Sequence, residues 1–484
     1  MRLEALLSHV TGAEPGHAPD ADVTGVTCDS RQVRPGFVFV AIPGAKLDGW
    51  TFMGTAIERG AVAVVSEHGE APRGASHVRV PDAHLALAEL AAAFHRFPAR
   101  RLQVVGITGT NGKTTVSYMV RDILAAAGRA PGLIGTVEYR IGERAIPASR
   151  TTPEATALQD MLAQMVNAGC RSAAMEVSSH SLHQKRVAGI DFDVGVFTNL
   201  TQDHLDYHKT MEAYFEAKTL LFEGLGLGAK KAAGVINIDD AWGRRLAARS
   251  DFRAEILTFG TAPEAAVRAV DVDLRRDGST FVACTPWGEA RIRLPLLGRY
   301  NVSNALAALA ACGALDVPLD IAARVLAQFT RVPGRLEEVE TSRGFQVFVD
   351  YAHTDDAMKN VLTTLRELNP KRLIIVFGCG GDRDKKKRPL MGGVAATLAD
   401  YSILTSDNPR TEAPADILTQ VREGFGTSTN YEIVEDRAQA IQRAIQIASS
   451  GDIILIAGKG HEGFQEFAHT KVPFDDRQVV RKFL

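Results

Sequence analysis

One segment of the sequence constrains the fold more than any other. The apolar run Leu102 to Ile107 leads into a glycine turn, and an amphipathic helix follows from Lys113. A strand, a glycine turn and a helix in this order are typical of phosphate-binding loops, because the glycines let backbone N–H groups converge on phosphate oxygens at the positive end of the helix dipole. The turn consists of Gly109, Thr110, Asn111, Gly112, Lys113, Thr114 and Thr115.

The side chains of this turn indicate a nucleotide triphosphate. Lys113 can reach the terminal phosphates, and the Thr114 hydroxyl can hold magnesium. The strict P-loop spacing requires a glycine where Ile107 stands, so the segment is a variant of that loop. A glycine-rich turn alone is often structural, but Lys-Thr at a strand-to-helix junction favours phosphate binding.

The chain of 484 residues is too long for one hydrophobic core. Strands and helices alternate through most of it, whereas alternating Val270, Val272 and Leu274 before Asp277-Gly278 indicate an antiparallel hairpin between about 255 and 297. We therefore predict an α/β protein with three domains. They are a small N-terminal α/β domain (1–98), a central P-loop-type mononucleotide-binding parallel sheet with a small antiparallel insertion (99–334), and a C-terminal Rossmann-like doubly wound domain (335–484).

Charge and cysteine usage exclude several classes of protein. The formal net charge is -2, and Lys385 to Arg388 is the single dense basic run, which we interpret as a solvated loop; no nucleic-acid partner is expected. The five cysteines are widely spaced, which fits reduced thiols in a cytosol. The start lacks the pattern of a signal peptide, and no apolar run approaches the ~18 residues of a membrane span, so we expect a cytoplasmic protein that does not contact a membrane.

Two polar residues follow strands that neighbour the glycine turn. Glu176 ends the predicted strand that begins at Ser172, and His204 follows the predicted strand Val194 to Phe197. Because the carboxyl ends of parallel strands meet at one edge of a sheet, both side chains are candidates to face the turn. Magnesium prefers oxygen ligands, so Glu176 is the better metal candidate. Taken singly, such residues are more often capping groups, and Lys218 reads as a solvated helix lysine.

Together these segments resemble the Mur ligases, the cytosolic amide-forming enzymes of peptidoglycan assembly. The similarity extends from Cys28 to Glu462. It is carried by the glycine turn, by Glu176-Val177-Ser178-Ser179-His180, Asp203-His204-Leu205-Asp206-Tyr207-His208, Asn301-Val302-Ser303-Asn304, Pro333-Gly334-Arg335 and Asp350-Tyr351-Ala352-His353-Thr354.

The resemblance implies a catalytic centre with ATP and two magnesium ions. Catalytic roles go to Lys113, Glu176, His204 and Lys218, and the implied metal ligands are Thr114, Glu176, His204 and Lys218 as its carbamate. Besides the turn from Gly109 to Thr115, the residues implied for ATP are Asn301, Asn304, Arg335, Asp350 and His353.

Within the family, the segment Asp407 to Arg410 resembles the member that adds meso-diaminopimelate. An arginine fork matches a carboxylate in bidentate fashion, and diaminopimelate has a distal carboxylate that lysine lacks. A lysine-adding ligase is therefore disfavoured by Arg410. The resemblance assigns the amino acid to Arg383, Asp407, Asn408, Pro409, Arg410, Gly458 and Glu462, with Glu462 facing the distal ammonium.

For the other substrate, the resemblance implies a UDP-N-acetylmuramoyl dipeptide. Its uridine diphosphate end is assigned to Cys28, Ser30, Ala45, Lys46 and Leu47, and its dipeptide end to Thr151, Thr152, Ser178, Gln184 and Arg186. The sequence departs from the family pattern at Arg150, where asparagine is frequent, and at Asp355, where proline is usual.

The function implied is an ATP-dependent ligase that adds meso-diaminopimelate to the D-glutamate of UDP-N-acetylmuramoyl-L-Ala-D-Glu through an acyl phosphate, as a monomer. One alternative is a folylpolyglutamate synthetase, which shares the ATP loop but should lack the Asp407 to Arg410 segment and the uridine-binding first domain. Another is a nucleotide-dependent switch or motor, which would turn over ATP without the precursor or the amino acid.

Overall fold

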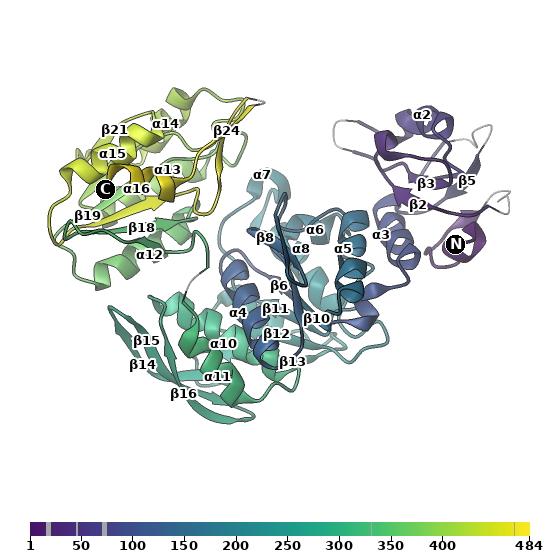
Figure 1. The fold of residues 1–484 in the computed structure, drawn as a ribbon, viewed down its shortest axis with the longest axis horizontal. Coiled ribbons are helices and arrows are strands. Elements are labelled where there is room, and N and C mark those ends of the chain that lie inside the picture. Colours follow the sequence, from purple (N-terminus) through teal and green to yellow (C-terminus); the bar gives the residue numbers. More distant parts are fainter. Residues whose placement is uncertain (16–20, 45–46, 70–74, 331, 469) are drawn as a thin grey trace.

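The protein is described by a computed structural model that covers residues 1–15, 21–44, 47–69, 75–330, 332–468 and 470–484. Its three large β-sheets occupy three units that follow one another along the chain, with the first and last units on different sides of the central one (Figure 1). Helices alternate with mostly parallel strands in each unit, so the predicted α/β class is confirmed. Among the described residues, no helix combines the length and the apolar character needed to cross a bilayer.

The first unit holds a five-stranded sheet in the order β1-β5-β4-β3-β2, with only β1 antiparallel to its neighbour. Its elements are α1 (Leu3–Leu7), β1 (Glu14–Pro15), β2 (Gly25–Thr27), β3 (Phe37–Val40), α2 (Met53–Glu58), β4 (Ala63–Ser66), β5 (Ser76–Arg79) and α3 (Ala83–Phe94). The Ala/Leu-rich run from about His84 to Phe97 predicts one helix, but α3 ends at Phe94, because Arg96 and Phe97 have positive φ. The linker expected at Pro98–Arg101 is a 3-10 helix with Pro98 and Ala99 buried.

The central unit is built on an eleven-stranded sheet. Its strands are β6 (Gln103–Thr108), β7 (Pro131–Ile134), β8 (Glu138–Ile141), β9 (Arg144–Pro147), β10 (Ser172–Glu176), β11 (Val194–Phe197), β12 (Ala233–Asn237), β13 (Glu255–Gly260), β14 (Val267–Arg275), β15 (Gly278–Thr285) and β16 (Gly288–Leu294). Its helices are α4 (Lys113–Ala126), α5 (Ala155–Asn167), α6 (Ser179–His183), α7 (Leu205–His208), α8 (Met211–Glu223), α9 (Ala241–Ala247), α10 (Arg299–Gly313) and α11 (Leu319–Gln328).

The strand order of this sheet is β16-β15-β14-β13-β12-β11-β6-β10-β7-β8-β9. The predicted hairpin is confirmed, since β14 pairs antiparallel with β15. The range predicted for the antiparallel insertion was too wide, because β13 lies within it and pairs parallel with β12. The antiparallel strands therefore extend the main sheet. A second antiparallel edge, formed by β8 and β9, was missed because both strands are short and carry charged residues.

The helix after the glycine turn buries the stripe that its sequence predicts. The stripe residues Val116, Met119, Val120, Ile123 and Leu124 all have no exposed surface. The alanine-rich run Asn304 to Leu315 predicts a helix, and α10, which packs beside α4, begins five residues earlier at Arg299. The earlier start brings Asn301 and Asn304 into its first turns. The start of α4 is therefore held between the sheet and a second helix.

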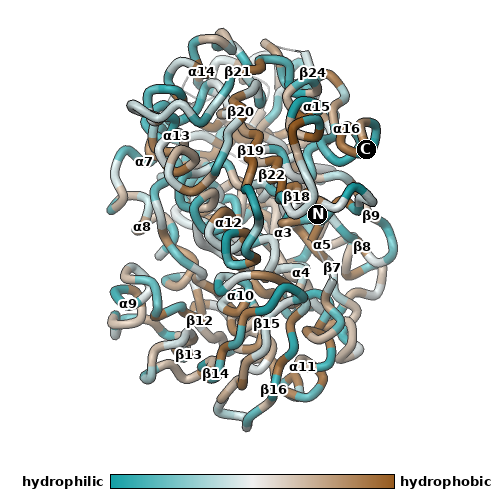
Figure 2. Tube along the Cα trace, turned by 90° about the vertical axis from the view of Figure 1, so that its left-hand side faces the viewer, coloured by the Kyte–Doolittle hydropathy of each residue, from teal (hydrophilic) through white to brown (hydrophobic). Residues whose placement is uncertain are grey.

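The C-terminal unit has a six-stranded sheet in which β17 alone is antiparallel, and a separate hairpin. Its strands are β17 (Glu337–Val339), β18 (Gln346–Asp350), β19 (Leu373–Phe377), β20 (Tyr401–Leu404), β21 (Tyr431–Ile433), β22 (Ile453–Ala457), β23 (Phe464–Phe467) and β24 (Thr470–Pro473). Its helices are α12 (Asp355–Glu367), α13 (Lys387–Leu398), α14 (Pro414–Glu423), α15 (Arg437–Ile447) and α16 (Asp476–Phe483). The order is β17-β18-β22-β19-β20-β21, and the apolar strands β19 and β22 run through the interior (Figure 2).

Candidate active site

The glycine turn between β6 and α4 can only be built with glycine at two positions. Gly109 and Gly112 have φ of 144° and 88°. A Cβ on Gly109 would lie 1.9 Å from Oγ1 of Thr198, and one on Gly112 would lie 2.4 Å from Oδ1 of Asn304. The backbone is thus packed against its neighbours and leaves its N–H groups at the start of α4, which is the arrangement that cradles phosphate. Nζ of Lys113 donates to the carbonyl oxygens of Gly109 and Thr110, at 3.0 and 2.9 Å.

Glu176 ends β10, the strand next to β6, and its side chain lies against the turn. The fully buried carboxylate accepts hydrogen bonds from Oγ1 of Thr114 at 3.1 Å, and from the backbone N–H and Oγ1 of Thr136 at 2.7 and 3.0 Å. A carboxylate and hydroxyl oxygens of this kind form the hard-oxygen donor set that magnesium prefers. The residues at this edge therefore fit the metal implied by the sequence.

Lys218 is not the solvated helix lysine that its sequence suggests by itself. It is 1% exposed, and its Nζ donates to the carbonyl oxygen of Gly109 at 2.8 Å, the same oxygen that Lys113 contacts. Burial, together with the positive charge of Lys113, lowers the pKa of Lys218 well below its usual value. A neutral amine is nucleophilic, so this environment is compatible with carbamate formation.

His204 lies on the other side of the turn, in the loop that starts α7. It has a left-handed backbone with φ of 56°, and its ring Nε2 lies 3.4 Å from Oδ2 of Asp203. Burial lowers the pKa of His204 to about 3, so the imidazole is neutral at pH 7 and has a free lone pair for a ligand.

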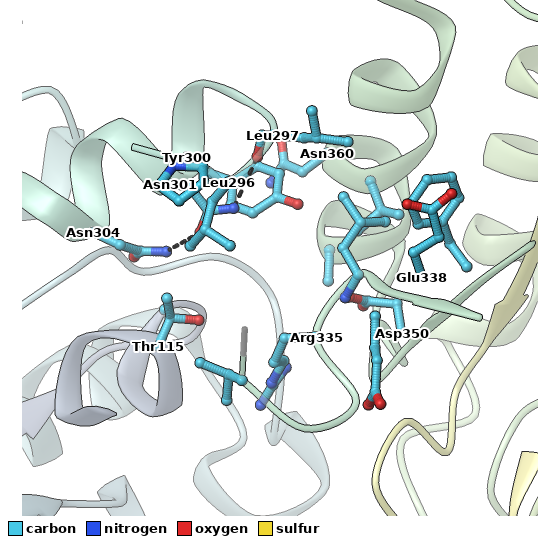
Figure 3. Close-up of a pocket in the computed structure, with 18 of the residues that line it drawn as sticks. Thr115, Leu296, Leu297, Tyr300, Asn301, Asn304, Arg335, Glu338, Asp350 and Asn360 are labelled. Carbon is cyan, nitrogen blue, oxygen red and sulfur yellow. Dashed lines mark hydrogen bonds between the residues drawn. The ribbon is translucent and has the colours of Figure 1, made fainter. Parts of the chain in front are cut away.

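A cavity of about 710 Å³ lies between α10, the glycine turn and the C-terminal unit (Figure 3). Nδ2 of Asn301 donates to the carbonyl oxygen of Leu297 at 2.8 Å, and Nδ2 of Asn304 donates to Oδ1 of Asn301 at 3.0 Å. The predicted residues that line it are Asn111, Gly112, Thr114, Thr115, Asn301, Asn304, Arg335 and Asp350. Leu297, Tyr300 and Asn360 also line it and were not predicted; the available signal was that Leu297 and Tyr300 closely precede the predicted ATP residue Asn301.

Arg335 and Asp350 shape the wall of this cavity. Nη2 of Arg335 donates to Oγ1 of Thr114 at 3.0 Å, which joins the C-terminal unit to the glycine turn. The carboxylate of Asp350 accepts from the backbone N–H groups of Leu336 and Ala352, both at 2.6 Å. In this structure Asp350 therefore holds the turn that presents Arg335.

A second cavity, of about 260 Å³, opens between the central and C-terminal units. It brings together residues predicted for three ligands. Those assigned to ATP or metal are Thr110, Asn111, Gly112, Lys113, Thr114, Glu176, His204, Arg335 and His353; Thr151 comes from the precursor set, and Arg383, Asp407, Arg410, Gly458 and Glu462 come from the amino-acid set. Burial and the positive charge of Lys387 lower the pKa of His353 to about 4.

Arg410 is held in place on the C-terminal side. Its Nε donates to Oε2 of Glu466 at 3.1 Å, and its Nη1 donates to the carbonyl oxygen of Gly381 at 2.7 Å. Its backbone φ of 52° turns the chain toward the hairpin of β23 and β24. Glu466 was not predicted, because it lies outside the segments that carry the resemblance.

Asn408 and Glu462 are joined by a lysine that the sequence reading also left out. Nζ of Lys459, which is fully buried, donates to Oδ1 of Asn408 at 2.9 Å and to Oε2 of Glu462 at 2.8 Å. Nδ2 of Asn408 donates to the same Glu462 oxygen at 2.9 Å. Asn408 and Pro409 line neither cavity. Asn408 contacts Glu462, which lines the 260 Å³ cavity.

The basic run Lys385 to Arg388 is not a solvated loop as predicted. Lys385 is exposed, but Lys387 is 6% exposed and Arg388 has no exposed surface. Nη1 and Nη2 of Arg388 donate to the two carboxylate oxygens of Glu412, both at 2.9 Å, and Nη2 also donates to the carbonyl oxygen of Gly380 at 3.2 Å. The change from two exposed residues, Lys385 and Lys386, to two buried ones coincides with the start of α13 at Lys387.

The predicted precursor residues lie where the first unit meets the central one. Oγ1 of Thr152 donates to the carbonyl oxygen of Glu176 at 2.8 Å and accepts from the backbone N–H of Ser178 at 3.1 Å. Nε of Arg186 lies 3.1 Å from Oε2 of Glu154, and Arg186 also donates to Oε1 of Gln184. Arg150, the departure from the family pattern, pairs with the same Glu154.

The residues predicted for the uridine end do not form one cluster in the described part of the chain. Burial and the negative charge of Glu154 raise the pKa of the Cys28 thiol to about 11, so Cys28 is near this group. Ser30 lies in a 3-10 helix and Leu47 is 67% exposed. Ala45 and Lys46 lie outside the described residues. Among the residues described here, none of the uridine set lines the two cavities.

Comparisons with known proteins cover almost the whole chain. Three family models match successive parts of it: "Mur ligase family, catalytic domain" at residues 22–95, "Mur ligase middle domain" at 107–312, and "Mur ligase, glutamate ligase domain" at 334–460. The chain is 45% identical to the UDP-N-acetylmuramoyl-L-alanyl-D-glutamate–2,6-diaminopimelate ligase of Geobacter metallireducens, over 99% of this chain and 98% of that protein. It is 44% identical to the protein of the same name from Geobacillus thermodenitrificans, over 99% of each. A solved structure of a ligase with this name has a TM-score of 0.68 and 35% identity, covering 95% of this chain and 94% of that one.

Proposed function

The chain belongs to the Mur ligase family, and on that basis we propose that it uses ATP to join meso-diaminopimelate to the D-glutamate of UDP-N-acetylmuramoyl-L-alanyl-D-glutamate. The observation that carries the proposal is the 260 Å³ cavity, which has Lys113 and Glu176 on one wall and Arg410 on the other. Full-length relatives that carry the name of a diaminopimelate-adding ligase disfavour a folylpolyglutamate synthetase and a lysine-adding ligase.

The reaction proceeds through an acyl phosphate. A carboxylate oxygen of the D-glutamate side chain bonds to the γ-phosphorus of ATP, and the bond from that phosphorus to the β-phosphate oxygen breaks, which releases ADP. The amine of diaminopimelate then bonds to the activated carbonyl carbon. The bond from that carbon to the phosphate oxygen breaks, and phosphate leaves. Lys113 and Arg335 neutralise charge on the phosphoryl group, since positioning and electrostatics supply most of the catalysis in such transfers.

We assign the metal ligands to Thr114, Glu176, His204 and the carbamate of Lys218. The buried oxygens around Glu176 support a hard cation at this edge. Bound magnesium would neutralise phosphate charge and orient the phosphoryl group. The protein excludes water from the Glu176 carboxylate and keeps the His204 ring neutral.

Carbamylation of Lys218 is part of the proposal. It is supported by the burial of the amine and by its lowered pKa, because only the neutral amine reacts with carbon dioxide. The mass of the intact protein, measured under native conditions with and without bicarbonate, tests it.

For diaminopimelate we propose that Arg410 binds the distal carboxylate and that Glu462 faces the distal ammonium. The remaining members of this site are Arg383, Asp407, Asn408, Pro409 and Gly458. The precursor is assigned to Cys28, Ser30, Ala45, Lys46, Leu47, Thr151, Thr152, Ser178, Gln184 and Arg186, which is supported by the meeting of Cys28, Glu154 and Arg186.

We propose domain limits of 1–98, 99–334 and 335–484, which is supported by the separate sheets and cores of the three units. The protein is further proposed to act in the cytoplasm as a monomer, with no nucleic-acid or membrane partner.

The decisive experiment measures phosphate release with ATP and the UDP-linked muramoyl dipeptide, with meso-diaminopimelate or lysine added in parallel. We expect amide formation with diaminopimelate and little with lysine. Equal rates with both amino acids would remove the specificity proposal. ATP turnover without precursor or amino acid would instead favour a nucleotide-dependent switch.

A further inference from the structure

Lys459 is a fully buried lysine directly behind the proposed amino-acid site. Its Nζ donates to Oε2 of Glu462 at 2.8 Å and to Oδ1 of Asn408 at 2.9 Å. Lys459 lines neither cavity, whereas Glu462 lines the 260 Å³ cavity. A buried ammonium is tolerated where a counter-charge and hydrogen bonds offset the cost of removing it from water. Lys459 can therefore affect a ligand in the cavity only through the residues that it holds.

The protein holds the carboxylate of Glu462 by one of its two oxygens. Besides Lys459, Nδ2 of Asn408 donates to Oε2 of Glu462, at 2.9 Å. Within the described part of the chain, no donor contacts Oε1, and the Glu462 side chain is 21% exposed. An ionised carboxylate can only accept hydrogen bonds. The free oxygen is therefore suited to a donor, such as an ammonium group, in the cavity.

A closely packed turn fixes Lys459 and Glu462 relative to each other. The backbone N–H of Glu462 donates to the carbonyl oxygen of Lys459 at 2.9 Å. Gly460, inside the turn, has a φ of 53°, and a Cβ there would lie 2.7 Å from the carbonyl oxygen of Gly334 and 2.8 Å from Cβ of Tyr351. The backbone has little space to move, so the orientation of the Glu462 carboxylate depends on its side-chain hydrogen bonds.

Asn408 connects Lys459 to the other end of the amino-acid site. Oδ1 of Asn408 accepts from the backbone N–H of Glu466 at 3.0 Å, and Oε2 of Glu466 accepts from Nε of Arg410 at 3.1 Å. Both Glu462 and Arg410 line the cavity. Lys459 contacts Glu462 directly, but it is separated from Arg410 by two residues. Its removal should therefore affect the Glu462 end first.

We propose that Lys459 is a positioning residue for recognition of the amino acid. It holds Oε2 of Glu462 and so directs Oε1 toward the distal ammonium of diaminopimelate. This inference rests on the proposed ligase reaction and on the proposed place of Glu462. Without Lys459, a single hydrogen bond from Asn408 holds the carboxylate, which can then rotate away from the ammonium. The contacts of Arg410 with the distal carboxylate remain.

The test compares Lys459→Met with the matched control Lys471→Met in the full-length protein. The ammonium groups of Lys459 and Lys471 lie 5.7 and 4.2 Å from the ring centroid of Phe464, but Lys471 is exposed and lines neither cavity. Each variant is assayed with meso-diaminopimelate and with L-2-aminopimelate. The second amino acid keeps the distal carboxylate and lacks the distal ammonium, so it cannot use Glu462.

We expect Lys459→Met to lower kcat/KM for diaminopimelate by about 10- to 100-fold, as for the loss of a hydrogen bond to a charged group. The value for L-2-aminopimelate should change by less than about 3-fold, so the preference for diaminopimelate falls. Exchange of labelled ADP into ATP, with precursor and without amino acid, should also stay within about 3-fold of wild type. Lys471→Met should change each value by less than about 2-fold.

The ratio of the two amino acids separates positioning from a structural role. Equal losses with both would overturn the inference, because they would mean that Lys459 only supports the fold of this region. An unchanged or lowered KM for diaminopimelate with unchanged kcat would overturn it as well. If Lys459→Met does not fold, as judged by its thermal midpoint, Lys459→Arg replaces it. The guanidinium keeps the charge but not the shape of the ammonium, so the ratio should again fall, and an unchanged ratio would overturn the inference.

Failure of the proposed function would be visible in the wild-type protein. If the wild type forms no amide, calorimetric binding of the two amino acids to wild type and Lys459→Met still tests Lys459. Affinity for diaminopimelate alone should then fall in the variant. If the wild type does not bind diaminopimelate, both the proposed function and the inference are wrong.

Discussion

At the residue scale, the glycine turn gives the sharpest prediction, because two glycines with similar backbones differ in their surroundings. Gly112 and Gly128 have φ of 88° and 71°. A methyl group on Gly112 would meet Asn304 at 2.4 Å, whereas one on Gly128 meets nothing within 4 Å. We expect Gly112→Ala to weaken ATP binding by about 10-fold or more. Gly128→Ala should cost only the backbone strain of about 1–2 kcal/mol and leave ATP binding unchanged.

Calorimetric titration with ATP, together with unfolding of both variants, checks this prediction. Equal losses of ATP affinity in the two variants would mean that backbone strain, and not the crowded turn, is responsible.

Arg410 gives a second prediction at this scale. Two nitrogens of its guanidinium bind Glu466 and Gly381, which fixes the orientation of the fork. A lysine at this position keeps the charge and loses the bidentate geometry, so Arg410→Lys should raise the KM for diaminopimelate by about 10- to 100-fold. Steady-state kinetics measures this, with the exposed Arg422→Lys on α14 as the control. An unchanged KM would place the distal carboxylate elsewhere.

The residues around the phosphate turn were largely predictable, and the buried cations were not. The positions of Glu176 and His204 followed from strand ends that meet at one sheet edge. The local pattern alone was interpreted as that of a solvated lysine at Lys218, although Tyr214, Leu221 and Phe222 place this residue on the buried stripe of α8, so the helical period contained the signal. Arg388 was misread because its partner Glu412 is 24 residues away, and sequence spacing does not reveal such a pairing.

At the scale of elements, the pair of Arg388 and Glu412 joins two segments of the proposed amino-acid site. Arg388 lies on α13 and contacts Gly380, while Glu412 follows the Asp407 to Arg410 segment and accepts from the backbone N–H of Asp382 at 2.7 Å. Removing one partner of a buried ion pair costs about 3–5 kcal/mol, and we expect that loss of unfolding free energy for Arg388→Met.

Lys385→Met is the matched control, because exposed Lys385 lies 3.0 Å from the same carboxylate. Its loss should stay within about 1 kcal/mol, as for surface ion pairs. Denaturant unfolding measures both variants, and similar losses would show that Arg388 is not the main partner of Glu412.

The same pair predicts how stability depends on pH. Hydrogen bonds from Arg388 lower the pKa of Glu412 from 4.5 to about 2. The unfolded chain therefore binds the proton more readily, so this contribution is complete above pH 4.5 and is lost as the pH falls toward 2. Glu412→Gln should flatten the decline of the unfolding free energy in that window, which unfolding at several pH values measures. A wild-type slope in the variant would contradict the assignment.

The regular elements were predictable where apolar periodicity is strong, and their pairing was not. Strand β11 was predicted with its observed bounds, and the stripe of α4 is buried as expected. The parallel pairing of β13 with β12 was missed. Alternation of apolar and polar residues indicates a strand, but it does not indicate which neighbouring strand it pairs with. The early end of α3 depends on the positive φ of Arg96 and Phe97, which ordinary propensities disfavour.

At the scale of the whole molecule, the two steps of the proposed reaction depend on residues of different units. The glycine turn and Glu176 belong to the central sheet, and Arg410 belongs to the C-terminal one. We therefore expect Arg410→Lys to leave acyl-phosphate formation within about 3-fold of wild type while amide formation falls, since only the second step uses the amino-acid site. Exchange of labelled ADP into ATP, in the presence of precursor and without amino acid, measures the first step.

Equal losses in both steps would contradict this separation. They would indicate that the amino-acid site must be intact before the phosphoryl group moves.

The division into three units could be predicted from the chain length and from the pattern of strands and helices. The contacts between the units could not. The central and C-terminal units meet where loop residues contact the first turns of helices: Nδ2 of Asn111 donates to Oδ2 of Asp356 on α12 at 2.8 Å, and Arg335 donates to Thr114 on α4. Single contacts of this kind between distant residues leave no periodic pattern in a sequence. Asp355, the departure from the family pattern, does not prevent a normal helix start, since Thr354 caps α12.

The walls of the 260 Å³ cavity come from two units, the central one and the C-terminal one. A synthetic inhibitor bound there would contact both units at once and hold them together. Its release would then require the central and C-terminal units to separate. The rate of that motion, more than the strength of any one contact, would therefore set the residence time of the inhibitor.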